Sequence, residues 1–263
     1  MTPLVSILVP TFNQVPGYLM AALQSARLQT IPVEVCVCDD GSDPRQEPLV
    51  ERSMKEWGSG PIKYTWQPNG GVAAALNTCL EMACADWIAW LPSDDLYTMD
   101  HLQIMVEALK ASSGHGPLGP GQSWDDRLGR VAYCSYEEGI PITGARWPAA
   151  QFPTRERLFG SLQRGCFINA ATLVWHRSVF DEVGEWDPRM THVQDAEHIM
   201  RCAEKLNFRA VHHYGVRRRL HPRQMIHTLR DHAERAKKEA DMAYLKERYG
   251  VTGGVWVPEE PKA

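Results

Sequence analysis

The chain has 263 residues, of which 44% are hydrophobic and 23% are charged, so it can bury a full core as one large domain or two small ones and is neither disordered nor fibrous. Its formal net charge of -4 gives no overall attraction to nucleic acid or anionic lipid, and nucleic acid is not an expected partner. Seven cysteines without paired spacing indicate reduced thiols, and no segment has the ~20 apolar residues of a membrane span. The N-terminus also lacks a signal-peptide pattern, which makes a cytoplasmic protein the expectation.

The first hundred residues alternate between strand and helix patterns. Strands are expected at residues 4–9, 33–38 and 62–66 and in the apolar run that begins at Trp87, and helices at 18–29, about 46–57 and 72–83. A βαβ series of this kind predicts an α/β fold with a mostly parallel sheet and right-handed crossovers.

The second half of the chain has a less regular pattern. A Gly- and Pro-rich stretch at 112–121 marks a break between two subregions. Beyond it we expect strands at 131–136 and 170–175, an irregular segment at 145–154, helices at 178–183 and about 194–206, a charged helical tail at 223–249 and a frayed end at 258–263.

Three predicted strands end in polar residues. The first runs into Thr11-Phe12-Asn13, the second into Asp39-Asp40, and the strand that begins at Trp87 into Asp94-Asp95. Because parallel strands present their carboxyl ends at one edge of a sheet, we expect these groups to meet where open α/β sheets bind ligands. Adjacent carboxylates repel unless a cation compensates them, and a divalent ion with a diphosphate would do so. The alternative is an Asp-rich turn or a helix N-cap.

The first strand is followed neither by the Gly-x-Gly-x-x-Gly turn of a dinucleotide site nor by a P-loop. The acids instead follow the second and fourth strands. That placement suits a nucleotide if one carboxylate accepts a hydrogen bond from the base or ribose and another holds a metal at the diphosphate.

Several motifs in order carry a family resemblance. Residues 5–13, Cys38-Asp39-Asp40-Gly41-Ser42, Asn69-Gly70-Gly71 and Ser93-Asp94-Asp95 resemble those of family 2 glycosyltransferases with the GT-A fold, and the similarity continues to about residue 227. Residues 93–102 look most like the spore-coat polysaccharide branch of that family. The resemblance implies one GT-A domain at 1–227, with a nucleotide-binding half at 1–111 and an acceptor half at 112–227, followed by a charged helix and tail at 228–263.

The resemblance also implies roles in nucleotide binding. Pro10, Thr11, Phe12 and Asn13 would line the base pocket, and Asp40 would accept a hydrogen bond from a pyrimidine ring N–H, which uracil and thymine carry and cytosine does not. The alternative for Asp40 is turn capping with Ser42. The backbone of Asn69, Gly70 and Gly71 would approach the nucleotide, although Asn-Gly-Gly is also an ordinary turn.

At the acidic pair, the first acidic position of the family motif is Ser93 here. Asp94 would contact the ribose, and Asp95 would bind Mn²⁺ or Mg²⁺ bridging the two phosphates. The family's Arg-x-His element matches Arg219 and His221, which would approach the departing diphosphate, with His221 a candidate second metal ligand. An ordinary basic surface is the alternative for at least one arginine of this stretch.

Inverting transfer needs a base, and Asp195 matches the family's catalytic Asp. The preceding acid of the family is Gln194 here, which removes a like charge beside the base and leaves Glu197 as a rival. The alternative for Asp195 is a favourable place in the first turn of a helix. Candidate acceptor contacts are Trp147, Cys166, Asn169, Trp175 and Glu197, the tryptophans because an aromatic face can pack against a sugar.

These expectations describe an inverting glycosyltransferase that moves a sugar from a UDP- or dTDP-sugar to an acceptor hydroxyl, in polysaccharide or glycoconjugate synthesis. A nucleotidyltransferase and a nucleotide-sugar-binding protein without catalysis are the alternatives. The loops that would select the acceptor contain no sequence pattern that identifies it. The charged C-terminal helix suggests a solvated face or a homodimer contact.

Overall fold

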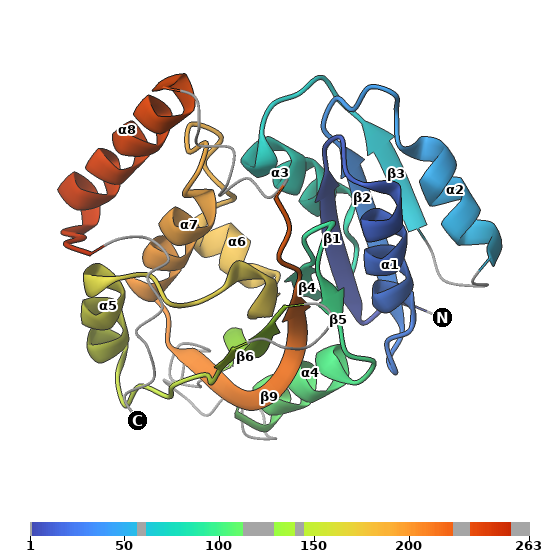
Figure 1. Cartoon of the computed structure of the whole chain (residues 1–263). Coiled ribbons are helices and arrows are strands. Elements are labelled where there is room, and N and C mark those ends of the chain that lie inside the picture. The colour runs from blue at the N-terminus through green and yellow to red at the C-terminus, as the bar shows by residue number, and fades with distance from the viewer. Residues whose placement is uncertain (1, 57–61, 113–128, 140–144, 223–231, 254–263) are drawn as a thin grey trace.

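The computed structural model describes residues 2–56, 62–112, 129–139, 145–222 and 232–253 (Figure 1). Its strands are β1 Val5–Thr11, β2 Val33–Asp39, β3 Ile62–Trp66, β4 Trp87–Trp90, β5 Leu96–Tyr97, β6 Val131–Glu138, β7 Arg146–Trp147, β8 Leu173–His176 and β9 Phe208–Arg218. The helices are α1 Pro16–Arg27, α2 Glu47–Glu56, α3 Val72–Met82, α4 His101–Ser112, α5 Arg155–Arg164, α6 Ser178–Val183, α7 Gln194–Ala203 and α8 His232–Tyr249, with a 3-10 turn at Ala170–Thr172.

Within the described residues, the strands form one mixed sheet in the order β3-β2-β1-β4-β8-β6-β9-β5, with β7 paired to β6. Strands β3, β2, β1 and β4 are parallel, and Val5 is in register with Val33 on one side and Trp87 on the other. The carboxyl ends of β1, β2 and β4 therefore lie at one edge of the sheet, as their sequence pattern predicts. This edge brings the predicted polar groups together.

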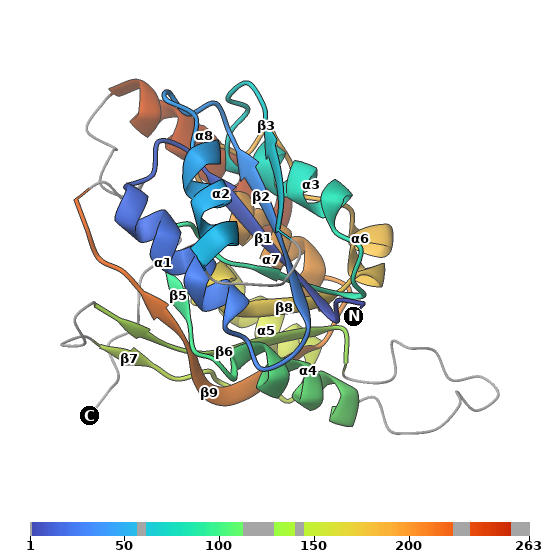
Figure 2. The ribbon, with the colours of Figure 1, turned by 90° about the vertical axis from the view of Figure 1, so that its right-hand side faces the viewer.

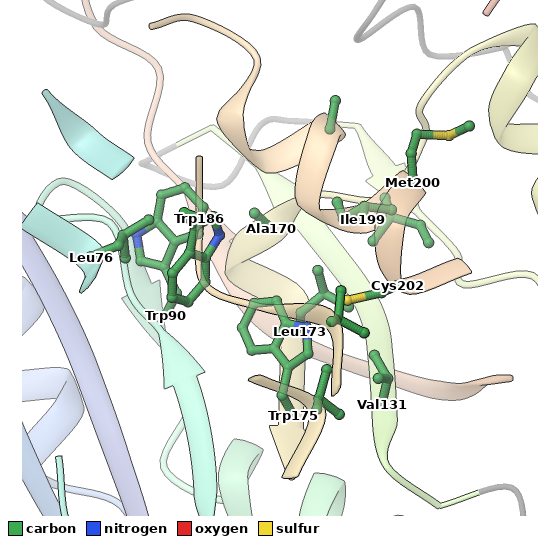
Figure 3. Packing of buried hydrophobic residues seen from close by; sticks show 14 of the residues in the cluster. Leu76, Trp90, Val131, Ala170, Leu173, Trp175, Trp186, Ile199, Met200 and Cys202 are labelled. Atoms are coloured by element: carbon green, nitrogen blue, oxygen red, sulfur yellow. The ribbon is translucent and has the colours of Figure 1, made fainter. Parts of the chain in front are cut away.

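Helices cover both faces of the sheet, and each face has its own apolar core. Alternate residues of β1 divide between the two cores, since Ile7 and Val9 lie in one and Leu8 in the other. Figure 2 shows α1 and α2 along one side of β1 and β2. In the other core, Trp186 makes edge contacts with Trp90 and Trp175, with ring centroids 6.3 and 5.8 Å apart (Figure 3). These aromatic contacts join the second half of the chain to the parallel strands.

Several elements differ from the sequence expectation. Residues 170–172 form a 3-10 turn rather than a strand, because the Asn169 side chain accepts a hydrogen bond from the Ala171 amide at 3.0 Å. Strand β7 lies within the segment expected to be irregular. Helix α5 and strand β9 had no predicted counterpart, and the expected helix at 223–249 is described from residue 232 onward. No helix in the described ranges is long and apolar enough to cross a bilayer.

Candidate functional site

Asp39 organises the loop after β2. One carboxylate oxygen accepts the Ser42 amide at 3.0 Å, and the other accepts the Gln46 amide at 2.8 Å and the Tyr64 hydroxyl at 3.0 Å. Gly41 has a φ of +87°, and a Cβ there would lie 2.7 Å from the backbone nitrogen of Asn69. Only glycine fits this position, since any other residue would be strained and would clash with backbone. The Asp-Asp-Gly-Ser motif is therefore a rigid loop.

Asp40 holds the neighbouring Asn69-Gly70-Gly71 turn against this loop. Its carboxylate accepts the Gly70 amide at 2.9 Å, the Gly71 amide at 2.8 Å and the Gln67 side-chain amide at 2.7 Å. Asp40 is thus not the cap of Ser42 that we considered, because Asp39 has that role. A carboxylate has about four acceptor positions, so one remains for a base N–H.

The segment after β1 divides into buried and exposed parts. Pro10 and Thr11 are buried, and the Thr11 hydroxyl donates to the Gln46 side chain at 2.5 Å. Asn13 has a φ of 45° and accepts the Asp43 amide through its side chain at 3.0 Å. Phe12 is 52% exposed. Of the predicted base-pocket residues, Phe12 therefore offers a free apolar surface, whereas Thr11 and Asn13 shape the loop.

The acidic pair after β4 lies against the segment that follows β9, with Asp95 buried and Asp94 partly exposed. Asp95 is 4% exposed and accepts the Arg219 amide at 2.9 Å. Burial and the adjacent Asp94 charge raise the pKa of Asp95 well above its ordinary value, and the Arg219 hydrogen bond opposes this rise in part. Ser93, at the family's first acidic position, accepts a hydrogen bond from the Gln14 side chain at 3.1 Å.

Arg219 and His221 both reach Asp94. The Arg219 Nε donates to the Asp94 carbonyl at 2.9 Å, and the His221 Nε2 lies 2.9 Å from the Asp94 Oδ2. Tyr18 of α1 supports both residues: the Arg219 guanidinium carbon is 4.3 Å from the centre of its ring, and the His221 ring is 4.8 Å away. The sequence analysis did not identify Tyr18. Its only sequence signal is that it is an aromatic residue in the first turn of the helix that follows a strand-end loop.

Asp94, Asp95 and His221 supply two carboxylates and an imidazole to one cluster. Across the described residues, no group of three or more His, Cys, Asp or Glu side chains is arranged to hold a metal by itself. An ion shared with a diphosphate needs one or two protein ligands, because phosphate oxygens and water complete its coordination. The Asp95 carboxylate is a ligand that Mn²⁺ and Mg²⁺ prefer, whereas His221, whose Nε2 lies at Asp94, has only its Nδ1 left for a metal.

The predicted base Asp195 lies in the first turn of α7 and is partly exposed. Its carboxylate accepts the Ala196 amide at 2.8 Å, which agrees with a stabilising place at a helix N-terminus and leaves its role as a base open. The rival Glu197 is 2% exposed and accepts hydrogen bonds from Arg201 at 2.7 and 3.0 Å and from the Tyr249 hydroxyl at 2.8 Å. These contacts make Glu197 part of a buried ion pair, which does not support a role as base or acceptor contact.

Most predicted acceptor contacts lie in the core. Cys166 is 4% exposed, Asn169 6% and Trp175 1%, and Figure 3 shows Trp175 packed among core side chains. Cys166 and Trp175 belong to the apolar core, and the Asn169 side chain caps the 3-10 turn, so direct acceptor contact is not supported for these three. Trp147 is partly exposed on β7 and stacks on Tyr136 at 6.2 Å. Trp147 remains the acceptor candidate with accessible surface.

The sheet edge combines rigid strand-end loops with an acidic pair and an Arg-x-His segment, the motifs on which the family resemblance rests. The chain belongs to glycosyl transferase family 2, whose model matches residues 6–184, more than half of the sequence. Membership of this family removes the nucleotidyltransferase alternative. The spore-coat branch remains a prediction.

Several curated relatives are much longer than this chain, which matches only part of each. An uncharacterized glycosyltransferase of Rickettsia conorii is 27% identical over 73% of this chain and 30% of its own length. Chondroitin synthase of Pasteurella multocida is 35% identical over 40% of this chain and 11% of its own length. The chain spans 21% of the length of another relative, from Sinorhizobium fredii, so it corresponds to a fraction of each of these proteins.

Solved structures share the fold. TarS of S. aureus in complex with UDP-GlcNAc has a TM-score of 0.63 and 15% identity, covering 94% of this chain and 73% of the other. A mannosyltransferase of Pyrobaculum calidifontis, in complex with GDP-Man and Mn²⁺, has a TM-score of 0.63 and 17% identity, covering 96% of this chain and 66% of the other. The GT-A fold expected from the motifs is therefore confirmed.

Proposed function

We propose that this glycosyltransferase moves a sugar from a UDP- or dTDP-sugar to an acceptor hydroxyl, with inversion at the anomeric carbon. In this proposal residues 1–111 bind the nucleotide and residues 112–227 bind the acceptor. The observation that carries it is the Asp94-Asp95 pair at the sheet edge, in which Asp95 is buried and Arg219 and His221 contact the segment that carries both acids. Two neighbouring carboxylates under two basic side chains suit a metal-bound diphosphate better than a structural turn.

A pyrimidine donor is supported by Asp40. Its carboxylate keeps one acceptor position, and the ring N–H of uracil or thymine would fill it. Phe12 would supply an exposed aromatic face for the base to pack against, and the adjacent Thr11 carbonyl accepts the Asp40 amide at 2.8 Å. The TarS complexes with UDP and UDP-GlcNAc show that this fold accepts a UDP donor, and the complex with GDP-Man makes a guanine donor the outcome to test against.

The proposed reaction is a direct displacement. The acceptor oxygen attacks the anomeric carbon as the bond from that carbon to the diphosphate oxygen breaks, and Asp195 takes the acceptor proton. Asp94 would orient the ribose, and Arg219 would donate hydrogen bonds to the departing nucleoside diphosphate. The Nε2 of His221 lies at Asp94, so its other ring nitrogen would serve either the diphosphate or the metal. A divalent ion held by Asp95, with His221 as the candidate second ligand, would neutralise charge on the leaving diphosphate.

The class of acceptor is inferred from the relatives. Chondroitin synthase and hyaluronan synthase are among the relatives, which supports a role in polysaccharide or glycoconjugate synthesis. A binding protein without catalysis is the second candidate, because Ser93 and Gln194 replace two acids of the family pattern.

The test is nucleotide release from a donor panel. The protein is incubated with UDP-glucose, UDP-GlcNAc, UDP-galactose, a dTDP-sugar or GDP-mannose, with Mn²⁺ or Mg²⁺, and the released diphosphate is measured beside UDP binding by calorimetry. We expect slow release from a UDP- or dTDP-sugar and Mn²⁺-dependent UDP binding. Binding without release or transfer to any acceptor would identify the binding module. Absence of nucleotide binding would refute both candidates.

A further inference from the structure

The segment that leads into α7 has no local cap. Val193 is the N-cap residue of α7, and its side chain makes no capping hydrogen bond. The first amides of a helix have no partner within it, and in α7 the Asp195 side chain accepts one of them, the Ala196 amide, at 2.8 Å. Asp195 lies two residues after this uncapped position, so the placement of its carboxylate depends on what holds the preceding loop.

The loop before α7 is held from α8, about fifty residues further along the chain. The Asp241 Oδ2 accepts the Thr191 amide at 2.9 Å, the His192 amide at 2.8 Å and the Thr191 hydroxyl at 3.3 Å. Asp241 is 5% exposed although it lies on a strongly charged helix. A buried carboxylate that accepts three hydrogen bonds is a strong and directional anchor.

Helix α8 makes polar contacts with the loop before α7, with α7 itself and with the residue that follows it. Before α7, the His192 Nε2 lies 3.0 Å from the Glu234 Oε2. At the middle of α7 the Tyr249 hydroxyl donates to Glu197 at 2.8 Å, and beyond its end Arg248 pairs with Glu204 at 3.0 Å. Between these contacts the two helices and the loop at 185–189 line a cavity of about 610 Å³. The helix is therefore fixed by these polar contacts together with the buried side chains of Leu245 and Tyr249, which belong to the apolar core.

We propose that Asp241 is a positioning residue that sets the place of the Asp195 carboxylate by anchoring the amides of Thr191 and His192. The inference rests on the proposed function, in which Asp195 is the base. It assigns a catalytic purpose to α8, which lies outside the residues matched by the family model. A base displaced by about 1 Å can lose about a hundredfold in rate, so the anchor affects turnover more than donor binding.

The main variant is Asp241→Asn, which keeps the shape of the side chain and removes its charge. Turnover is measured as UDP release from the panel donor that the wild type hydrolyses fastest. We expect kcat to fall about tenfold, with the donor KM and the UDP affinity within about twofold of wild type. The control is Glu239→Gln, an exposed acid two residues away on the same helix, which leaves all three unchanged. A fall in UDP affinity equal to the fall in kcat would overturn the proposal, since it would indicate general damage to the fold.

Two further measurements separate positioning from structure. In the Asp195→Asn background, Asp241→Asn should cause less than about a twofold further loss, because an anchor for an absent base has nothing left to position. Hydrogen exchange of peptides covering residues 187–200 should accelerate in Asp241→Asn, with peptides of β1 and β2 unchanged. Additive losses, or unchanged exchange at 187–200, would overturn the inference.

The two hypotheses fail in different ways. If Asp195→Asn keeps full turnover, the proposed base is wrong and the positioning role falls with it. If Asp195→Asn is inactive and Asp241→Asn equals wild type, the base stands and the positioning role alone is refuted.

Discussion

Two buried carboxylates lie at opposite edges of the parallel strands, and their surroundings differ. Glu34, near the start of β2, is 1% exposed and pairs with Lys63 at 2.8 Å. It also accepts the Ser6 hydroxyl at 2.5 Å and the Cys84 amide at 2.6 Å. Burial by itself would raise the pKa of Glu34, but these hydrogen bonds outweigh it and lower the pKa to about 2.

Asp95, beyond the end of β4, is 4% exposed, and its pKa is shifted in the opposite direction by burial and by Asp94. Each edge therefore holds a buried acid, but only the acid at the amino-terminal edge has its charge compensated by a neighbouring lysine. A charge left incompletely compensated costs stability, and such sites commonly serve function. The comparison assigns stability to the Glu34 edge and ligand binding to the Asp95 edge.

The largest expected effect belongs to the chemistry served by the Asp95 edge. Asp195→Asn should lower the rate of UDP release by about 10²- to 10⁴-fold, because a neutral amide cannot take the acceptor proton. UDP affinity should stay within about twofold of wild type. Asp181→Asn, at an exposed acid on α6, is the matched control and should retain full turnover. Normal turnover in Asp195→Asn would show that Asp195 is not the catalytic base.

At the other edge, Glu34→Gln should reduce the free energy of unfolding at pH 7 by roughly 2–3 kcal/mol, after allowance for solvent near Lys63. The folded pKa of about 2 lies below the ordinary value of 4.5, so this stability is fully present above about pH 4.5 and is lost as the pH falls toward 2. Urea unfolding at several pH values measures it, with Glu81→Gln on the exposed face of α3 as control. Glu34→Gln should bind UDP with wild-type affinity. A large loss of affinity would contradict the assignment of Glu34 to stability alone.

Substitutions at the acidic pair should have the opposite effect to Glu34→Gln, with a loss of UDP affinity and little change in stability. Asp95→Ala should lower UDP affinity in Mn²⁺ about a hundredfold and change the free energy of unfolding by about 1 kcal/mol or less, because its charge is poorly compensated without a metal. Asp94→Ala should weaken UDP binding about tenfold. In EDTA, wild type and Asp95→Ala should bind UDP equally. Calorimetry decides between these roles, and equal effects of the two substitutions in Mn²⁺ would refute the division of labour.

The strand order of the first half could be predicted because apolar runs alternate with helical patterns there. Strand β3 has the predicted bounds, and the polar strand ends meet at one edge as expected. Strand β9 could not be predicted from its own residues, because its buried and exposed positions do not alternate and it contains several charged and histidine side chains. It forms through pairing with β6 and β5. Helix α5 did leave a signal, the capping residue Thr154, which accepts the Arg157 amide at 3.3 Å.

The candidate site divides in the same way. Motifs in sequence order predicted Asp40, Asp95, Arg219 and Asp195, because each motif is local. The partners of these residues are not local. Tyr18 meets Arg219 from the other end of the chain, and a single sequence contains no signal for such a contact. The expected acceptor contacts also failed because side-chain type does not reveal burial. Trp175 is a residue type that can pack against a sugar, but it lies in the core.

The smallest expected effect tests whether the closed arrangement around Asp94 is part of the binding site. Tyr18→Leu removes the aromatic face under Arg219 and His221 and should weaken UDP binding about fivefold, which corresponds to about 1 kcal/mol for the lost cation–π contact. Tyr18→Phe keeps that face and should bind like wild type. Calorimetry measures both, and urea unfolding should show that neither changes stability. If phenylalanine and leucine weaken binding equally, the hydroxyl rather than the ring matters, and Arg219 and His221 are held over the acidic pair by Asp94 and Asp95 alone.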